Sequence, residues 1–354
     1  MKQKSAKSAK KGYTKRGVGR PKPRAKSLTH FIMGNGTEFI QYGVLPSEPA
    51  TYSEVMLKNI LNKNDTTENN SLSVMLHSAS SLTESLRRIT YKEGFSTGKS
   101  LYRMLNATKH YSMYEESIPD LVSFLESAGL GTMTYSIFES NPSFAIYGAP
   151  SIYIGSNIHT FEAGIISGFI STVRHQYIPI NETECINNNS NVCKFSASEE
   201  PEAGIEMDEN ESKRILGNVV NNISTSTEGS VSSSFLSLLS NVLTRREYLP
   251  EMKGVFSYIG SELGAKIQGK TSSAKMLNFA NVLNSIYANK PKVTSIKPVS
   301  LILNFDGTRF RSEFVDLSLS FLNGALPRLS GTQEMKAIEI NKYDMHKIRI
   351  AEQR

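Results

Sequence analysis

Glu182-Thr183-Glu184-Cys185 and Cys193-Lys194-Phe195 flank a stretch, 186–192, that is mostly Asn and Ser. A polar, Asn-rich connection of this length predicts the loop of a hairpin. Cys185 and Cys193 are the two cysteines of the chain, and Glu182 lies three positions before the first of them. Two thiolates and a carboxylate carried by one hairpin would supply three of the four ligands of a tetrahedral metal site.

The fourth ligand must come from outside the hairpin, and His159 is the best candidate. It begins a predicted helix, Phe161–Val173, that precedes the strand carrying Glu182. Glu182 and Cys185 are an odd number of positions apart, so a flat strand would point them to opposite faces. We therefore expect this strand to end or bulge between them.

Each of these residues also has a simpler interpretation. The alternative for the cysteines is a pair of small buried side chains or an incidental disulfide. His159 would serve as a helix-start or core histidine, and Glu182 as a solvated carboxylate at a strand end.

The residues from His159 to Gly168, together with the Glu-x-x-Cys-x₇-Cys spacing of the hairpin, resemble the 4-vinyl reductase domain family. The segments Gly94–Gly98 and Phe124–Gly131 resemble it too, so that the likeness covers roughly 80–198. The family shares its α/β fold with subunits of the TRAPP tethering complex and forms the sensor part of bacterial regulators that detect aromatic compounds. Its usual pattern has a Cys where this chain has His159.

The resemblance implies a structural zinc ion held by His159, Glu182, Cys185 and Cys193, because four protein ligands leave no open coordination position. It also implies a pocket for a small hydrophobic ligand between the helices and the sheet. Candidate lining residues are Phe95, Phe124, Tyr147, Ile165 and Phe169. The alternative is that these five side chains are ordinary core, since composition does not separate pockets from cores.

Hydrophobic periodicity predicts an α/β (α+β) fold with helices packed on a mainly antiparallel sheet, in two related modules. Gly260 and Gly264 lie in an apolar helix, as Gly94 and Gly98 do, and similar elements follow them. A short hairpin is expected around 31–44, a helix at Tyr52–Leu61 and a strand at Leu72–Leu76. The predicted organisation is a disordered basic tail (1–28), a zinc-bearing module (29–198), an acidic and polar linker (199–229) and a degenerate module without metal ligands (230–354).

The charge of the chain is uneven. Of its 40 Lys and Arg, eleven lie before residue 27, where no acidic residue occurs, and the remaining 29 face 33 Asp and Glu. The tail resembles an AT-hook, a motif whose Gly-Arg-Pro core enters the minor groove of DNA rich in A·T pairs. The residues expected to bind nucleic acid are Lys15, Arg16, Gly19, Arg20, Pro21, Lys22 and Arg24. The alternative is a solvated tail that binds any polyanion.

These observations predict a zinc-stabilised sensing or binding protein that is regulatory and associated with DNA or another nucleic acid. No nucleophile elbow, phosphate loop or cofactor fingerprint occurs, which argues against an enzyme. The alternatives are a TRAPP-like scaffold and an enzyme acting on a tetrapyrrole or another hydrophobic substrate. A homodimer is one option for assembly.

No apolar run reaches the roughly 20 residues of a membrane span, and two cysteines do not form a disulfide framework. We therefore expect a cytoplasmic protein, which would lie close to the nucleoid if the tail binds DNA.

Overall fold

The structure is a computed structural model of the whole chain. It describes residues 29–33, 37–41, 52–63, 65–138, 141–148, 159–185, 192–198, 209–223, 229–287, 292–296, 299–306, 312–330, 335–342 and 345–352. The basic tail and its predicted nucleic-acid-binding residues therefore lie outside the described residues. The chain divides into two units, Met1–Thr51 and Tyr52–Arg354.

The described residues of the first unit form a hairpin. Strand β1 (Thr29–Met33) pairs antiparallel with β2 (Thr37–Gln41). The hairpin expected in this region is confirmed.

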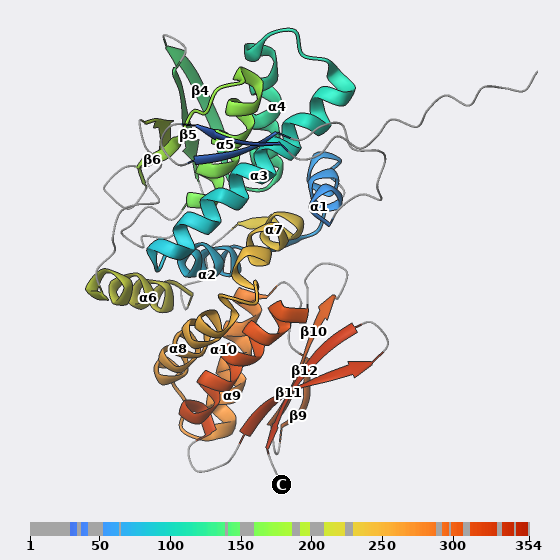
Figure 1. Cartoon of the computed structure of the whole chain (residues 1–354). Coiled ribbons are helices and arrows are strands. Elements are labelled where there is room, and N and C mark those ends of the chain that lie inside the picture. Colours follow the sequence, from blue (N-terminus) through green and yellow to red (C-terminus); the bar gives the residue numbers. More distant parts are fainter. Residues whose placement is uncertain are drawn as a thin grey trace, which may run out of the picture. The chain divides into compact units, whose positions relative to one another are not determined.

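The second unit begins with helices and a four-stranded sheet (Figure 1). The helices are α1 (Tyr52–Leu61), α2 (Asn70–Ser80), α3 (Glu84–Lys109), α4 (Tyr114–Ser127) and α5 (Thr160–Arg174). The strands are β3 (Thr67–Asn69), β4 (Thr132–Phe138), β5 (Asn141–Tyr147), β6 (Ile180–Glu184) and β7 (Val192–Ala197). The sheet is antiparallel, in the order β4-β5-β7-β6. It confirms the predicted mixture of helices and antiparallel sheet.

The rest of this unit follows the same plan, and Figure 1 shows α8, α9 and α10 together beside a second sheet. The helices are α6 (Glu209–Ile223), α7 (Ser233–Leu243), α8 (Leu249–Lys266), α9 (Ser272–Ile286) and α10 (Ser312–Ser330). The strands are β8 (Ser230–Ser232), β9 (Lys292–Ile296), β10 (Val299–Asp306), β11 (Met335–Lys342) and β12 (Met345–Glu352). This sheet has the order β11-β12-β10-β9.

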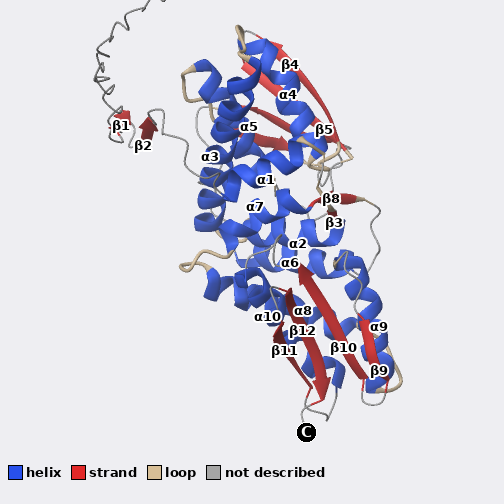
Figure 2. Ribbon diagram, turned by 90° about the vertical axis from the view of Figure 1, so that its right-hand side faces the viewer, coloured by secondary structure: helices blue, strands red, loops and turns tan. Residues whose placement is uncertain are grey.

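Helices α3 and α5 cross at glycines, which brings α5 and the histidine before it into a defined position. A Cβ on Gly98 would lie 2.0 Å from the carbonyl oxygen of Ile165, and one on Gly164 would lie 2.3 Å from that of Tyr91. Both distances are far below van der Waals contact, so the backbones approach closely only because glycine has no side chain. Figure 2 shows the two helices side by side in a second view.

One expectation from the sequence was wrong in local structure. Leu72–Leu76 is not a strand but part of α2, whose apolar residues are buried on all sides. Its polar residues Ser71, Ser73, His77, Ser78 and Ser80 are buried as well, so no exposed polar face marks the helical period. Residues 209–223 of the predicted linker form α6, which buries a stripe of apolar side chains: Ile215, Val219, Val220 and Ile223. The boundary between the two modules remains a prediction.

Candidate metal centre

The four predicted ligands come from one helix start and one hairpin. His159 is the N-cap residue of α5, Glu182 lies on β6, Cys185 directly follows β6, and Cys193 lies on β7. The pairing of β6 with β7 shifts register between Glu182 and Glu184, which is the bulge that the odd spacing required. The bulge allows Glu182 and Cys185 to face the same interior.

The structure brings these four side chains together. One donor atom from each of His159, Glu182, Cys185 and Cys193 lies within 4.8 Å of all the others. The two sulfur atoms are 3.7 Å apart. All four residues are buried, with at most 3% of any of them exposed. Among the described residues, they form a cluster whose donors suit a metal ion.

The donor set and its spacing fit a tetrahedral metal site. Two thiolates at about 2.3 Å from one ion, at the tetrahedral angle, lie about 3.8 Å apart. The observed sulfur separation of 3.7 Å agrees with this value. The His159 Nδ1 and Glu182 Oε1 atoms are closer, at 2.8 Å, because they form a hydrogen bond. They would separate by about 0.6 Å, to about 3.4 Å, to share a tetrahedral ion at about 2.1 Å from each.

Glu182 also anchors the start of α5. Its Oε2 accepts a hydrogen bond from the backbone N–H of His159 at 3.1 Å, while its Oε1 contacts the imidazole of the same residue. A carboxylate at a helix N-terminus satisfies an otherwise unpaired donor and interacts favourably with the helix dipole. The strand and the helix are therefore joined at this point by the protein itself.

Burial and charge determine the protonation of the cluster without an ion. Burial alone lowers the pKa of His159, but Glu182 and the cysteines raise it, and it lies well above the usual range. A hydrogen bond with Cys193, together with burial, raises the pKa of the Cys185 thiol. Burial also raises the pKa of Glu182, so the His159–Glu182 pair retains its proton strongly.

A second buried pair lies beside the cluster, and the sequence did not reveal it. His77 Nε2 on α2 is 2.6 Å from Glu162 Oε1 on α5, and its Nδ1 is 2.7 Å from the carbonyl oxygen of Ser73. A carbonyl only accepts, so Nδ1 carries its hydrogen. Burial raises the pKa of Glu162, but His77 lowers it more, to below the usual value. In the sequence, the only indication of this pair was that Glu162 lies one helical turn after the predicted ligand His159.

Aromatic rings lie beside both buried pairs, His159–Glu182 and His77–Glu162. The ring of His77 lies 5.7 Å from that of His159 and 6.3 Å from that of Phe235, measured between centroids. Phe195 of β7 contacts His159 edge-on, and Phe161 contacts Phe235 in the same way. Aromatic rings therefore form part of the surroundings of the cluster, next to the His77–Glu162 pair.

The predicted pocket residues differ in their surroundings. Phe124, Ile165 and Phe169 are fully buried, whereas Tyr147 is 49% exposed. Phe95 is partly buried and lies 5.7 Å from the ring of Tyr177. A pocket shared by all five remains a prediction.

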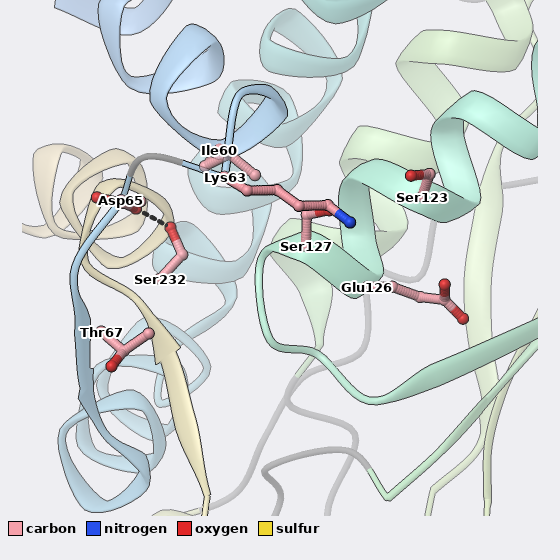
Figure 3. A pocket seen from close by; sticks show the side chains of 8 residues that line it. All are labelled: Ile60, Lys63, Asp65, Thr67, Ser123, Glu126, Ser127 and Ser232. Carbon is pink, nitrogen blue, oxygen red and sulfur yellow. Dashed lines mark hydrogen bonds between the residues drawn. The ribbon is translucent and has the colours of Figure 1, made fainter.

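A cavity of about 340 Å³ lies elsewhere, at the end of α1 (Figure 3). It is lined by Ile60, Lys63, Asp65, Thr67, Ser123, Glu126, Ser127 and Ser232. Its acidic side chains already have donors: Asp65 accepts from the backbone of Ser234 and from Ser232, and Glu126 accepts from the backbone of Met133. None of the predicted pocket residues lines this cavity.

Comparison with known proteins gives little. No protein-family model matches the chain, and no curated protein matches it either. A solved structure of a vinyl-4-reductase family protein from Methanocaldococcus jannaschii matches with 21% sequence identity and a TM-score of 0.25, over 34% of this chain and 68% of that chain. No described helix combines the length and apolar character needed to cross a membrane.

Proposed function

We propose that this chain is a zinc-stabilised binding protein in which His159, Glu182, Cys185 and Cys193 hold one structural Zn²⁺. The observation that carries the proposal is the convergence of four buried donor atoms within 4.8 Å. The sulfur separation of 3.7 Å is compatible with the edge of a tetrahedral site, and Cys, His and Glu are all ligands that zinc accepts.

The ion would stabilise the fold and would not act in a reaction. Four protein ligands complete a tetrahedral site, whereas a catalytic zinc keeps one position for water or substrate. The site is also buried, so a substrate would have no access to the ligands. The zinc would connect the β6–β7 hairpin to the start of α5, which the Glu182 hydrogen bonds already hold together.

The binding function proposed for this protein is the sensing of a small hydrophobic molecule. Support comes from the apolar side chains that two helices of the metal-bearing half bury: Ile165 and Phe169 on α5, and Phe124 on α4. Helices α4 and α5 are in contact. A ligand between them and the sheet would be held by apolar surface, as most small-molecule sites are.

The basic tail would associate the protein with nucleic acid. Its eleven Lys and Arg without any acidic residue support this part of the proposal. Fluorescence anisotropy with A·T-rich duplex DNA tests it, comparing the full chain with one that lacks residues 1–28. We expect binding that weakens steeply with salt and is lost with the tail. Equal binding by the shortened chain would contradict it.

The central experiment is native mass spectrometry with elemental analysis of the full chain. We expect one zinc per chain, and a co-purifying small molecule would appear as further bound mass. Glu182→Gln should lose the ion. Glu184→Gln is a matched control, because Glu184 lies two residues away and pairs on the surface with Lys194. A metal-free wild-type chain would refute the zinc site and leave His159 and Glu182 as a buried ion pair.

A further inference from the structure

The two halves of the Tyr52–Arg354 unit have the same topology. In each half, two helices precede the first strand of the sheet and one helix connects the second strand to the third. The strand order is β4-β5-β7-β6 in the first half and, read from its other edge, β9-β10-β12-β11 in the second. Each sheet therefore places its first, second, fourth and third strands side by side in that order.

The crossing of α3 with α5 in the first half has a counterpart in the crossing of α8 with α10, and the glycine contacts agree. A Cβ on Gly98 would clash with the carbonyl oxygen of Ile165, and one on Gly264 would approach that of Ala325. Gly94 and Gly260 face Phe161 and Phe321 in the same manner. Phe161, Gly164 and Ile165 of α5 therefore correspond to the residues 160 positions later on α10, which are Phe321, Gly324 and Ala325.

This correspondence explains why one half alone carries metal ligands. The position equivalent to His159 is Leu319, which lies inside α10 rather than at its start. An apolar side chain there does not bind an ion, and the chain has no cysteine after Cys193. The second half has the fold of the first without its metal chemistry.

The elements that join the halves meet in a reciprocal manner. Strands β3 and β8 occupy equivalent places, directly before α2 and α7, and they pair antiparallel with Glu68 opposite Val231 (Figure 2). Asn69 Nδ2 donates to the carbonyl oxygen of Asn284 at the end of α9, at 2.7 Å. On the other side, the backbone N–H of Ser232 donates to the carbonyl oxygen of Ala128, just after α4, at 3.0 Å. Helices α4 and α9 are themselves equivalent.

Helices α2 and α7 also make equivalent contacts with the opposite half. They contact each other; in addition α7 contacts α1, the helix before β3, and α2 contacts α6, the equivalent helix before β8. Such reciprocity, in which one element touches its counterpart and each reaches into the other half, is the mark of a two-fold interface between two copies of one protein.

We propose that the second half takes the place of a second copy, so that the chain is a two-fold dimer built into one polypeptide. The β3–β8 and α2–α7 contacts, which two separate chains would make in a homodimer, are completed within a single chain. The partner of the metal-bearing half is thus a metal-free half of the same fold. This proposal does not depend on the presence of zinc.

Light scattering of the full chain in solution is the first test. We expect the mass of one chain, 39.2 kDa, at all working concentrations. A stable mass of two chains would overturn the proposal.

Thiol cross-linking tests the pairing directly. Asn69 and Ser230 lie opposite each other in the β3–β8 ladder. In the double variant Asn69→Cys/Ser230→Cys, a short bis-thiol reagent such as dibromobimane should join the two residues within one chain. The single variants Asn69→Cys and Ser230→Cys are the controls. Cross-links between two chains, or no cross-linking beyond the single variants, would refute the pairing.

Discussion

The Nδ1 atom of His159 lies 2.8 Å from Oε1 of Glu182, and both side chains are buried. The same carboxylate accepts the backbone N–H of His159 through its other oxygen. Helix α5 and strand β6 are thereby joined at the point where Cys185 and Cys193 contribute their sulfur atoms. This arrangement makes separate predictions for the ligands, the protons and the neighbouring pair.

Cys193→Ser should remove zinc and destabilise the metal-bearing half. Serine is a poor zinc ligand at neutral pH, so metal affinity should fall by at least about tenfold, the lower end of what even outer-shell changes cost. Inductively coupled plasma spectrometry measures the metal, and thermal unfolding measures the stability. Unchanged metal content together with an unchanged melting temperature would count against the site.

Zinc binding should release protons, and affinity should rise with pH. Without an ion, His159 and Cys185 have a raised pKa and therefore hold their protons near neutral pH. Both must lose them to bind metal. Protons compete with the metal ion for these ligand atoms most strongly at low pH. The competition weakens as the pH rises toward the raised pKa values.

Calorimetric titration of metal-free protein, in buffers of different ionisation enthalpy, measures this release. We expect more than one proton per zinc. A heat of binding that does not depend on the buffer would show that the ligands are already deprotonated.

Glu162→Gln should cost about 3 kcal/mol of unfolding free energy, because it leaves the buried imidazole of His77 without its charged partner. Asp316→Asn is the control: Asp316 pairs with Lys253 at the surface, where such pairs contribute less than about 1 kcal/mol. Urea unfolding at neutral pH measures both. Equal costs would mean that the buried pair has no special role.

The same pair predicts a dependence on acid. The pKa of Glu162 is lowered in the folded state, so its contribution to stability is present above the unfolded pKa of about 4.3 and is lost as the pH falls below it. The difference between wild type and Glu162→Gln should therefore shrink in acid. A constant difference from pH 7 to pH 3 would contradict this assignment.

Gly98→Ala should destabilise the crossing of α3 and α5. The added methyl group would lie 2.0 Å from the carbonyl oxygen of Ile165, so the helices must separate, at a cost of about 1–3 kcal/mol or more. Gly254→Ala is the matched control: Gly254 also lies in a helix, but nothing lies within 4 Å of a Cβ there. It should stabilise by up to about 1 kcal/mol through helix propensity. Similar effects of both changes would refute the close crossing.

Sequence reasoning succeeded where a local pattern carries the structure. The α5 helix follows from its apolar spacing, and the bulge in β6 follows from the odd separation of Glu182 and Cys185. The helical period of α2 could not be recognised, because its serines and His77 are buried together with its apolar residues and leave no exposed face. Helix α6 was not predicted, because acidic residues at its start concealed an apolar stripe further along.

The amino-acid sequence by itself determined the mixed helix and antiparallel-sheet architecture and the identity of four candidate metal ligands. Both follow from chemistry that is local: side-chain period and the donor atoms of Cys, His and Glu. The tertiary structure alone decided that these donors converge in a buried cluster, that His77 and Glu162 lie beside them, and that β3 pairs with β8. These contacts join residues far apart in the chain, and only the packing of whole helices and sheets determines which distant residues meet.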